Sequence, residues 1–574
     1  MSKMTSRVNR RQMLIGTGAA AAAATIAAPG AQAAEAQHWD LDCDILCVGS
    51  GAAGGTAAAI AAAEGAKVIM IDKMPVIGGT TAKSSGLSWI FNNFAMREGG
   101  IADPKADALK FAVRMGFPTE YDPDSPSLGL DELRYRVVEA LYDHGAPAID
   151  RLQQLGVVKF RQFRMFNYDR LAADYADHLP ENKAPAGRAL DPVGGTQMSG
   201  GFSLTAQLAA YVEKQGMKVL TETRATRIVK DEAGRVIGIE ARQGDKPIRI
   251  RARKGVIFGT GGFVHNAELC NLHQPAIYGT CALPGATGDF LPLAQEAGAK
   301  MGNLGLAWRG QFLLGETLES RGVPWGVFMP AGDSMILVNK YGRRVVNEKR
   351  DYNDRTKAHF HFDASMEEYP NHMLFMLFDA RALDMFGGAF PIPVKPSEQP
   401  LLVQGADWAE VARGLDAQLA PWSGKTGGVR IAPDFVANLQ ETISRFNQYA
   451  RAGRDPEFHR GAFQYDQDWD LLFSPHRPGT KQSNPFPNKL MHPIADNGPY
   501  YAVILAPGAL DTCGGPQINA HAQVLAANGE PIAGLYGAGN CISAPTGQGY
   551  LGGGGTIGPA MTFGYIAAMH ATRS

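Results

Sequence analysis

The stretch CDILCVGSGAAGGTAAAIAAAEGAKVIMID, residues 43–72, contains the pattern that decides the fold of this chain. An apolar run ends in the turn Gly49-Ser50-Gly51-Ala52-Ala53-Gly54, and a helical pattern of small residues follows over 51–64. A second apolar run, 68–71, ends at Asp72. This order of strand, glycine turn, helix, strand and acid predicts a βαβ unit that binds a dinucleotide.

Each conspicuous residue of this unit has a physical role in that prediction. Gly49 allows the tight turn out of the strand, Gly51 lets a pyrophosphate approach the backbone, and Gly54 lets the helix pack close to the sheet. The helix N-terminus offers unpaired N–H groups to the phosphates, and Asp72 can accept hydrogen bonds from a ribose. A glycine-rich structural turn is the alternative, and the complete order of elements favours dinucleotide binding.

Composition excludes several classes of protein. The 574 residues are enough for one large core or for two to three domains. The chain has 55 Lys and Arg against 56 Asp and Glu, so nothing indicates nucleic acid or an anionic surface as a partner. The six cysteines lack the spacing of a zinc site, and we expect no metal.

The N-terminus resembles a twin-arginine export signal. Arg10 and Arg11 precede an alanine-rich apolar stretch, 15–28, and Ala31-Gln32-Ala33 fits a small-residue cleavage site. We therefore expect residues 1–33 to be a signal peptide and the mature protein to reach the periplasm. An uncut membrane anchor is the alternative. No Asp, Glu, Lys or Arg occurs between Glu530 and Arg573, but glycines and prolines interrupt that segment, so we expect no stable membrane span after signal removal.

Further glycine turns follow the first unit. A glycine- and hydroxyl-rich loop covers 78–86, a strand at 254–259 runs into Gly259-Thr260-Gly261-Gly262-Phe263, and a strand from 531 reaches a glycine turn at 537–540. Four glycines, 552–555, open a last helix predicted over 556–571. We expect helices near 131–155 and 202–214, and strands near 218–220, 226–230, 236–240, 334–339, 373–379, 501–505 and 524–525.

These patterns predict an α/β fold whose Rossmann-like cofactor domain is discontinuous. Its first part would cover 37–280 and its second part 491–574, with an inserted α+β substrate-capping domain at 281–490 that is rich in aromatic residues and loop-rich near 451–488. The layout favours FAD over NAD, because separated glycine turns can hold both ends of a long flavin cofactor. The N-terminus of the last helix could then stabilise an anionic reduced flavin.

The chain resembles the flavoprotein family of soluble fumarate reductases and 3-ketosteroid dehydrogenases. The resemblance rests on the turn at 49–54 with Asp72, and on segments 78–86, 259–263, 287–289, 342–348, 534–540 and 550–565. It implies FAD, and a substrate held between the cap and the flavin. The cofactor-binding residues that it implies are Gly49, Ser50, Gly51, Ala52, Ala53, Gly54, Asp72, Lys73, Gly79, Thr80, Thr81, Ser84, Ser85, Gly86, Ala225, Thr260, Gly261, Gly262, Asp289, Gly539, Asn540, Gly555, Thr556 and Ile557.

One position separates the two branches of this family. Fumarate-type reductases carry an arginine just before the last helix, which can pair with a carboxylate and deliver a proton. This chain has Tyr550 there, and its segment 550–565 is similar to that of 3-ketosteroid Δ1-dehydrogenases, apart from Leu551 in place of proline. A phenol with a pKa near 10 binds carboxylates poorly but donates well to a ketone oxygen.

The expected chemistry follows from that tyrosine. The Tyr550 hydroxyl and the Gly554 N–H form a two-donor site for a ketone oxygen, which acidifies the neighbouring C–H bond. A base then removes a proton beside the carbonyl while the next carbon gives a hydride to flavin N5. The resemblance implies further tyrosines: we assign Tyr352 as the base, with a packing tyrosine as the alternative, and Tyr175 as its assistant. It also implies that Asp289 caps a helix or holds backbone.

The sequence thus predicts an exported FAD enzyme that dehydrogenates a cyclic ketone, with a 3-ketosteroid as the expected substrate. Two alternatives stay open: an FAD-dependent reductase of an enone or of an α,β-unsaturated carboxylate, and a non-catalytic flavin electron carrier. The aromatic-rich cap argues against a pure carrier, which needs no apolar pocket. The partners would be a small ketone and an electron acceptor, namely a quinone, a cytochrome or a small redox protein.

Overall fold

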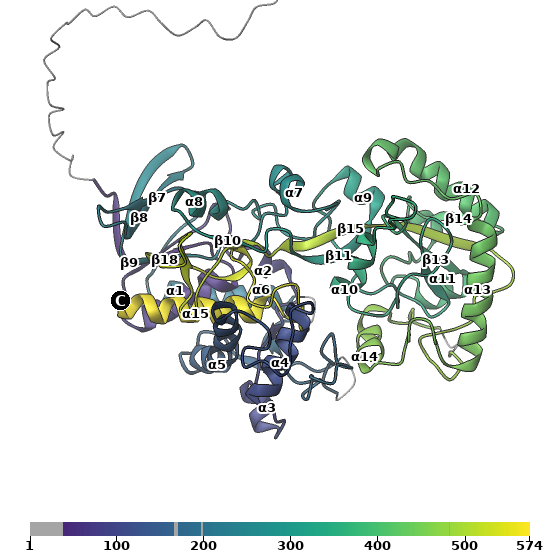
Figure 1. Cartoon of the computed structure of the whole chain (residues 1–574), viewed down its shortest axis with the longest axis horizontal. Helices are drawn as coiled ribbons and strands as arrows, with labels where there is room; N and C mark the ends of the chain where they lie inside the picture. The colour runs from purple at the N-terminus through teal and green to yellow at the C-terminus, as the bar shows by residue number, and fades with distance from the viewer. Residues whose placement is uncertain (1–37, 166–169, 197–198, 481–482) are drawn as a thin grey trace, which may run out of the picture. The chain divides into compact units, whose positions relative to one another are not determined.

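The segment that opens the sequence analysis forms the first unit of a large sheet. In the computed structural model, β1 (Leu41–Val48) pairs in parallel with β2 (Val68–Ile71), and α1 (Ala52–Ala63) connects them (Figure 1). The structure describes residues 38–165, 170–196, 199–480 and 483–574. Residues from Asp40 to Ser574 form one unit, and the predicted signal peptide lies outside the described residues.

The large sheet has eight strands and is mainly parallel. Its order is β17-β18-β9-β1-β2-β6, and a β7–β8 hairpin extends it from β9. The pairs of β1 with β2, β1 with β9, β9 with β18 and β2 with β6 are parallel, which confirms the predicted α/β, Rossmann-like class. The other strands are β6 (Lys218–Leu220), β7 (Thr223–Lys230), β8 (Val236–Gln243), β9 (Lys246–Phe258), β17 (Gln523–Leu525) and β18 (Pro531–Gly537).

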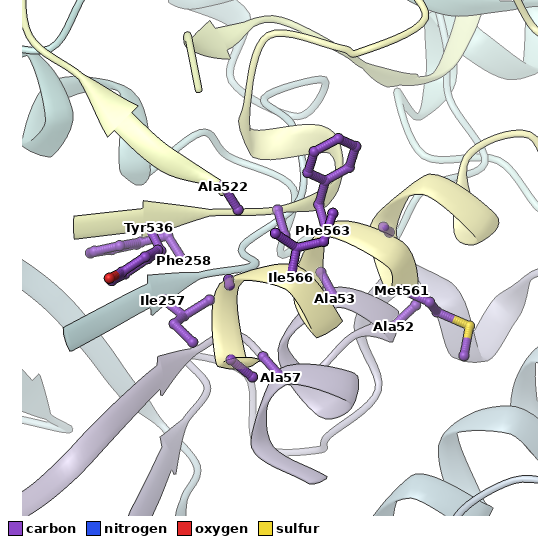
Figure 2. Packing of buried hydrophobic residues seen from close by; sticks show 14 of the residues in the cluster. Ala52, Ala53, Ala57, Ile257, Phe258, Ala522, Tyr536, Met561, Phe563 and Ile566 are labelled. Atoms are coloured by element: carbon purple, nitrogen blue, oxygen red, sulfur yellow. The ribbon is translucent and has the colours of Figure 1, made fainter. Parts of the chain in front are cut away.

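Two helices from opposite ends of the chain pack together beside this sheet. The alanine-rich α1 contacts the C-terminal α15 (Ile557–Arg573), and small residues let their backbones approach closely (Figure 2). A Cβ on Gly564 of α15 would lie 2.5 Å from the carbonyl oxygen of Ala53. Met561, Phe563 and Ile566 of α15 join the same buried core. This close packing brings both helix N-termini to the C-terminal edge of the parallel strands.

Seven further helices of the described residues precede residue 300. The helices are α2 (Gly79–Lys83), α3 (Phe94–Glu98), α4 (Lys105–Gly116), α5 (Glu132–Gln154), α6 (Gly200–Lys214), α7 (Ala267–His273) and α8 (Phe290–Glu296). The last of them, α8, lies within the range predicted for the cap although its Phe290 and Leu293 belong to this core. A small three-stranded sheet accompanies them. The small sheet has the order β3 (Ser88–Trp89), β5 (Ala189–Pro192), β4 (Phe160–Gln162), and β10 (Met301–Gly302) pairs with β16 (Gly515–Pro516).

A second, antiparallel sheet combines strands of the predicted cap region with β15, which lies in the segment predicted to belong to the cofactor domain. Its order is β11 (Ala307–Leu313), β15 (Tyr500–Thr512), β13 (Leu374–Asp379), β12 (Met335–Val338), and β14 (Val403–Gly405) also pairs with β15. Its helices are α9 (Leu314–Glu319), α10 (Tyr352–Lys357), α11 (Ala380–Phe386), α12 (Trp408–Leu419), α13 (Phe435–Ala452) and α14 (Gln464–Phe473). Two local expectations were incomplete: β15 is much longer than the strand expected at 501–505, and α14 lies within the segment expected to be loop-rich.

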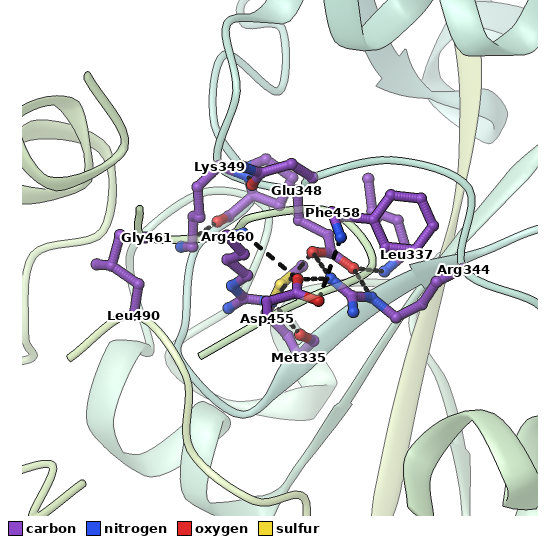
Figure 3. Close-up of polar contacts among 12 residues, drawn as sticks. Met335, Leu337, Arg344, Glu348, Lys349, Asp455, Phe458, Arg460, Gly461 and Leu490 are labelled. Atoms are coloured by element: carbon purple, nitrogen blue, oxygen red, sulfur yellow. Dashed lines mark hydrogen bonds and ion pairs between the residues drawn. The ribbon is translucent and has the colours of Figure 1, made fainter. Parts of the chain in front are cut away.

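A buried ion network holds the segment between β12 and α10. Glu348 accepts two hydrogen bonds of 2.8 Å from Arg344, and Arg460 lies 3.3 Å from the same carboxylate (Figure 3). Asp455 pairs with Arg344 at 2.9 Å. Burial alone would raise the pKa of Glu348, but the two guanidinium groups lower it to about 2. Because Glu348 comes four residues before Tyr352, the network fixes the chain that leads into α10.

No helix of the described residues combines the length and the apolar character that a bilayer crossing needs.

Candidate active site

A cavity runs along the C-terminal edge of the parallel strands. It is lined by the turn after β1, the end of β2, the start of α2, the glycine turn after β9 and the first turn of α15. The cavity brings together most of the residues predicted to bind the cofactor: Gly49, Ser50, Gly51, Ala52, Ala53, Asp72, Lys73, Gly79, Thr80, Thr81, Ser84, Ala225, Thr260, Gly261, Asp289, Gly539, Asn540, Thr556 and Ile557.

Five of the predicted cofactor residues do not line this cavity. A Cβ on Gly54 would lie 1.9 Å from the Gly49 carbonyl oxygen, so Gly54 packs the helix against the turn behind the wall. Gly86 packs in the same way against the backbone of α6. The others are Ser85, which lines a second cavity, and Gly555, which lines a small third one. The last is Gly262, whose N–H donates a hydrogen bond to Asp511 of β15.

Asp72 organises the turn that follows β1. Its carboxylate accepts hydrogen bonds from the Ser50 N–H at 3.0 Å, from the Ser50 hydroxyl, and from the Met74 N–H at 2.9 Å. The Ser50 hydroxyl in turn accepts from the Gly78 N–H at 2.8 Å. Asp72 therefore joins the first glycine turn to the loop at 78–86, while it stays at the cavity wall within reach of a ribose.

Asp289 belongs to an ion cluster at the cavity wall. It lies 3.0 Å from the Lys73 ammonium, and its carboxylate accepts two hydrogen bonds of 2.9 Å from Arg224. Burial acts to raise the pKa of Asp289, but Lys73, Thr287 and Arg224 lower it overall. The residue stands at the N-cap position of α8 without making a side-chain cap bond, so it holds neighbouring side chains and does not cap the helix as expected.

Sequence reasoning missed Asp511, near the end of β15. Its carboxylate accepts from the Gly262 N–H at 2.9 Å and from the Asn540 amide at 3.1 Å, and it lines both main cavities. Asn540 accepts in turn from the Trp308 indole at 3.0 Å. Burial raises the pKa of Asp511 to about 6. The only sequence signal was an acid at a strand end before two glycines, because the contact joins residues that are far apart in the chain.

The residues present fit an elongated cofactor with a pyrophosphate. The cavity runs past the N-termini of α1 and α15, which offer N–H groups and positive dipole ends. The positive φ of Gly49, +99°, allows the turn that brings backbone to the cavity wall. The buried Thr260 hydroxyl in the same wall has no hydrogen-bond partner among the described residues, so it is available to a ligand.

A second cavity of similar size adjoins the first one. The two share six lining residues, which are Thr80, Ser84, Asp511, Asn540, Thr556 and Ile557. Aromatic and aliphatic side chains make up much of its remaining wall, including Phe163, Trp308, Phe328, Trp469 and Phe473. A molecule in this cavity would therefore lie beside one end of the cofactor cavity, in mainly apolar surroundings.

The four residues predicted to be catalytic all line the second cavity. Tyr175, Tyr352 and Tyr550 expose only 2%, 6% and 5% of their surface, and Gly554 lies beside them. The Tyr175 hydroxyl donates to the Tyr352 hydroxyl at 3.0 Å. The ring of Tyr550 stacks on Tyr175, with centroids 5.3 Å apart, and meets the Tyr352 ring edge-on at 5.4 Å. Three segments widely separated in sequence thus form one cluster of phenols.

Burial sets the protonation of this cluster. It raises the pKa of Tyr175 and of Tyr352 well above the usual value, and it raises the pKa of Tyr550 as well. At neutral pH the three side chains are therefore neutral hydroxyls that can donate hydrogen bonds. Tyr352 becomes a phenolate, and hence a base, only as the pH rises.

The loop of Tyr550 and Gly554 is held by close backbone contacts. Gly554 has a φ of +93°, and a Cβ there would lie 2.3 Å from the Leu87 carbonyl oxygen. Its own carbonyl accepts from the Trp89 N–H at 3.1 Å. The Trp89 indole donates to Asp174 at 2.8 Å. The residue just before Tyr175 is therefore tied to the same strand that holds the glycine loop. No side chain can replace hydrogen at Gly554 without moving this backbone.

Helix α10 places Tyr352 at its first position. The preceding Asp351 accepts from the Asp354 N–H at 3.0 Å and caps the helix, so Tyr352 enters the cavity from a fixed N-terminus. The buried network around Glu348 holds the chain just before this cap. Tyr352 is therefore positioned by packing and hydrogen bonds on both sides of its backbone.

Comparison with known proteins identifies the family of this chain. The family model of the FAD binding domain matches residues 44–557. The chain belongs to this flavoprotein family. It is 31% identical over 562 residues to a 4-oxocyclohexanecarboxylate 2-dehydrogenase of Sinomonas cyclohexanicum, covering 91% of this chain and 92% of that protein. It is 29% identical over 607 residues to a 3-oxosteroid 1-dehydrogenase of Mycolicibacterium smegmatis, covering 92% and 96%.

A solved structure shows the same fold. The 3-ketosteroid Δ1-dehydrogenase of Sterolibacterium denitrificans superposes with a TM-score of 0.73 at 22% identity, covering 93% of this chain and 99% of that one. The cofactor is FAD, as predicted. The chain is an FAD-dependent oxidoreductase of the type that acts on CH–CH groups.

Proposed function

We propose that this flavoprotein dehydrogenates a cyclic ketone beside its carbonyl group, with a 3-ketosteroid or a smaller oxocyclohexane as the substrate. The observation that carries the proposal is the cluster of Tyr175, Tyr352 and Tyr550 with Gly554, in an apolar cavity that adjoins the cofactor cavity. Two relatives whose names describe dehydrogenases of cyclic ketones support it.

The protein's own groups account for the proton chemistry. The Tyr550 hydroxyl and the Gly554 N–H would hold the ketone oxygen, and the charge that develops on it as the neighbouring C–H breaks would be stabilised by both donors. Tyr352, as a phenolate, would take that proton on its oxygen, and Tyr175 would donate a hydrogen bond to the same oxygen. The apolar walls exclude water from the reacting carbons. FAD, when bound, supplies the hydride acceptor for the adjacent carbon.

The arrangement argues against an unsaturated carboxylate as the reacting group. The position that an arginine would occupy holds Tyr550, whose neutral phenol offers one donor and no charge. Apart from Lys83 at the exposed side, no described lining residue is basic, so a carboxylate placed at Tyr550 would lose its hydration without gaining a counter-charge. A ketone oxygen needs hydrogen-bond donors only.

The N-terminal segment indicates the compartment in which the reaction would take place. Arg10-Arg11 and the apolar stretch after them support export by the twin-arginine route, with reaction in the periplasm. A quinone, a cytochrome or a small redox protein would then take the electrons. Detection of the mature chain, cut after Ala33, in a periplasmic fraction tests this part.

Anaerobic flavin reduction tests the reaction itself. A panel of 3-ketosteroids and substituted cyclohexanones is mixed with the FAD-loaded protein, and the oxidised flavin absorbance is followed. We expect bleaching by at least one ketone and an α,β-unsaturated ketone as the product. Fumarate, added to the chemically reduced protein, should reoxidise it slowly or not at all. Fast reoxidation by fumarate with no bleaching by any ketone would overturn the proposal.

A further inference from the structure

The second cavity has a buried end and an exposed mouth with different chemistry. The tyrosine cluster occupies the buried end, whereas the lining residues Lys83, Ser85, Pro324 and Trp325 are exposed to solvent. Trp325, for example, exposes 44% of its surface. A ketone held by Tyr550 at the buried end would therefore direct its opposite end toward this mouth.

Lys83 is the one basic side chain among the described residues that line the cavity. The one acidic side chain, Asp511, is committed to the Gly262 N–H and the Asn540 amide at the cofactor side. The Lys83 ammonium donates to the Val323 carbonyl oxygen at 3.1 Å, which holds it beside the mouth. In the described part of the chain, no carboxylate forms an ion pair with it, so its charge is available to a ligand.

Two further donors lie at the same mouth. The Ser85 hydroxyl follows Lys83 by two residues, and the Trp325 indole follows Val323 by two residues. Neither makes a hydrogen bond to another described residue. A cationic amine, a hydroxyl and an indole N–H on one rim favour a ligand group that is negative and accepts several hydrogen bonds.

We propose that the substrate is a keto acid: its ketone binds at Tyr550 and Gly554, and a carboxylate at its far end binds at the mouth, where Lys83 selects for it. This inference rests on the proposed function, because it places the ketone at the tyrosine cluster. The two ends of the cavity would then have different roles. The buried end recognises a neutral carbonyl and the mouth recognises an anion, so the acid lies apart from the reacting carbons.

Matched acid and ester pairs test the selectivity. The pairs are 4-oxocyclohexanecarboxylate with its methyl ester, and 3-oxo-4-androstene-17-carboxylate with its methyl ester, each mixed anaerobically with the FAD-loaded protein. In at least one pair, kcat/KM for the acid should exceed that for the ester by about tenfold. The difference should lie mainly in KM, because the charge is remote from the reacting atoms. Added salt should reduce the preference.

Variants assign the preference to Lys83. Lys83→Met should reduce the acid-to-ester ratio by about tenfold, and Lys83→Arg should restore most of it. Lys214→Met is the matched control, since Lys214 is exposed at the end of α6 and lines neither cavity, and it should leave the ratio unchanged. The inference is overturned if both esters react as well as their acids, or if Lys83→Met preserves an acid preference. If no ketone of either pair bleaches the flavin, the proposed function itself fails.

Discussion

Replacing Tyr550 by phenylalanine removes one hydroxyl and leaves the packing of the ring intact. The ring stacks on Tyr175 at 5.3 Å and meets Trp308 edge-on at 5.4 Å, and phenylalanine can keep both contacts. Stability should therefore fall by only about 1 kcal/mol, the net contribution of one hydrogen bond. Turnover should fall by about 10² to 10³-fold, or roughly 3–4 kcal/mol, because the ketone oxygen loses one of its two donors as charge develops.

Anaerobic stopped-flow measurement of flavin bleaching gives the rate, and flavin absorbance of the purified variant shows whether FAD stays bound. Tyr465→Phe is the matched control. Tyr465 is buried in the same aromatic cluster, with its ring 5.2 Å from Tyr175, but its hydroxyl has no hydrogen-bond partner among the described residues. Its removal should change the rate by about twofold at most. A Tyr550→Phe rate within about tenfold of the native rate, or an equal loss in both variants, would refute the assigned role.

Three other outcomes follow from the geometry. Burial raises the pKa of Tyr352, so the phenol is neutral at neutral pH and its phenolate fraction grows only as the pH rises. The bleaching rate should therefore rise from neutral toward alkaline pH, and a rate independent of pH would exclude Tyr352 as the base. Gly554→Ala places a Cβ 2.3 Å from the Leu87 carbonyl oxygen at positive φ, so the thermal midpoint should fall with a cost of about 1–3 kcal/mol, and activity should be lost with it. Glu348→Gln leaves two buried guanidinium groups without their shared anion and should cost about 3–5 kcal/mol in denaturant unfolding, whereas Glu132→Gln in an exposed pair should cost under about 1 kcal/mol. The pKa of Glu348 is lowered to about 2, so its contribution to stability is complete above its unfolded-state pKa of about 4.5 and is lost as the pH falls toward 2.

The sequence was sufficient for the cofactor part because its signals are local. The turn at 49–54, the acid at 72 and the glycines at 259–262 each act within a few residues of a strand end, and a glycine turn needs no distant partner to be recognised. The parallel order of β1, β2 and β9 then follows from the connections. Local patterning also located α5 and β13 to within one residue at each end.

The cap and the residues that wall the buried part of the site were less predictable, because they depend on contacts between segments that are distant in the sequence. Asp511 reaches the cavity wall because β15 lies beside the turn after β9, a contact across 249 residues of sequence. The aromatic walls contributed by Trp308 and Trp469 carry no motif. Tyr175 and Tyr352 were found through the family resemblance, since no spacing rule connects residues that far apart, and their catalytic roles stay predictions.

Strand β15 starts in the core of the cap sheet at Tyr500 and ends beside the cofactor cavity, next to Asp511 (Figure 1). Its partner β11 pairs with it in antiparallel orientation from Leu313 to Ala307, so two hydrogen-bonded strands connect the cap sheet with the surroundings of the cofactor cavity. Because main-chain hydrogen bonds join the two strands along this connection, we expect it to bend less easily than a pair of separate loops. Any movement of the cap relative to the cofactor part should therefore be centred on this two-stranded connection.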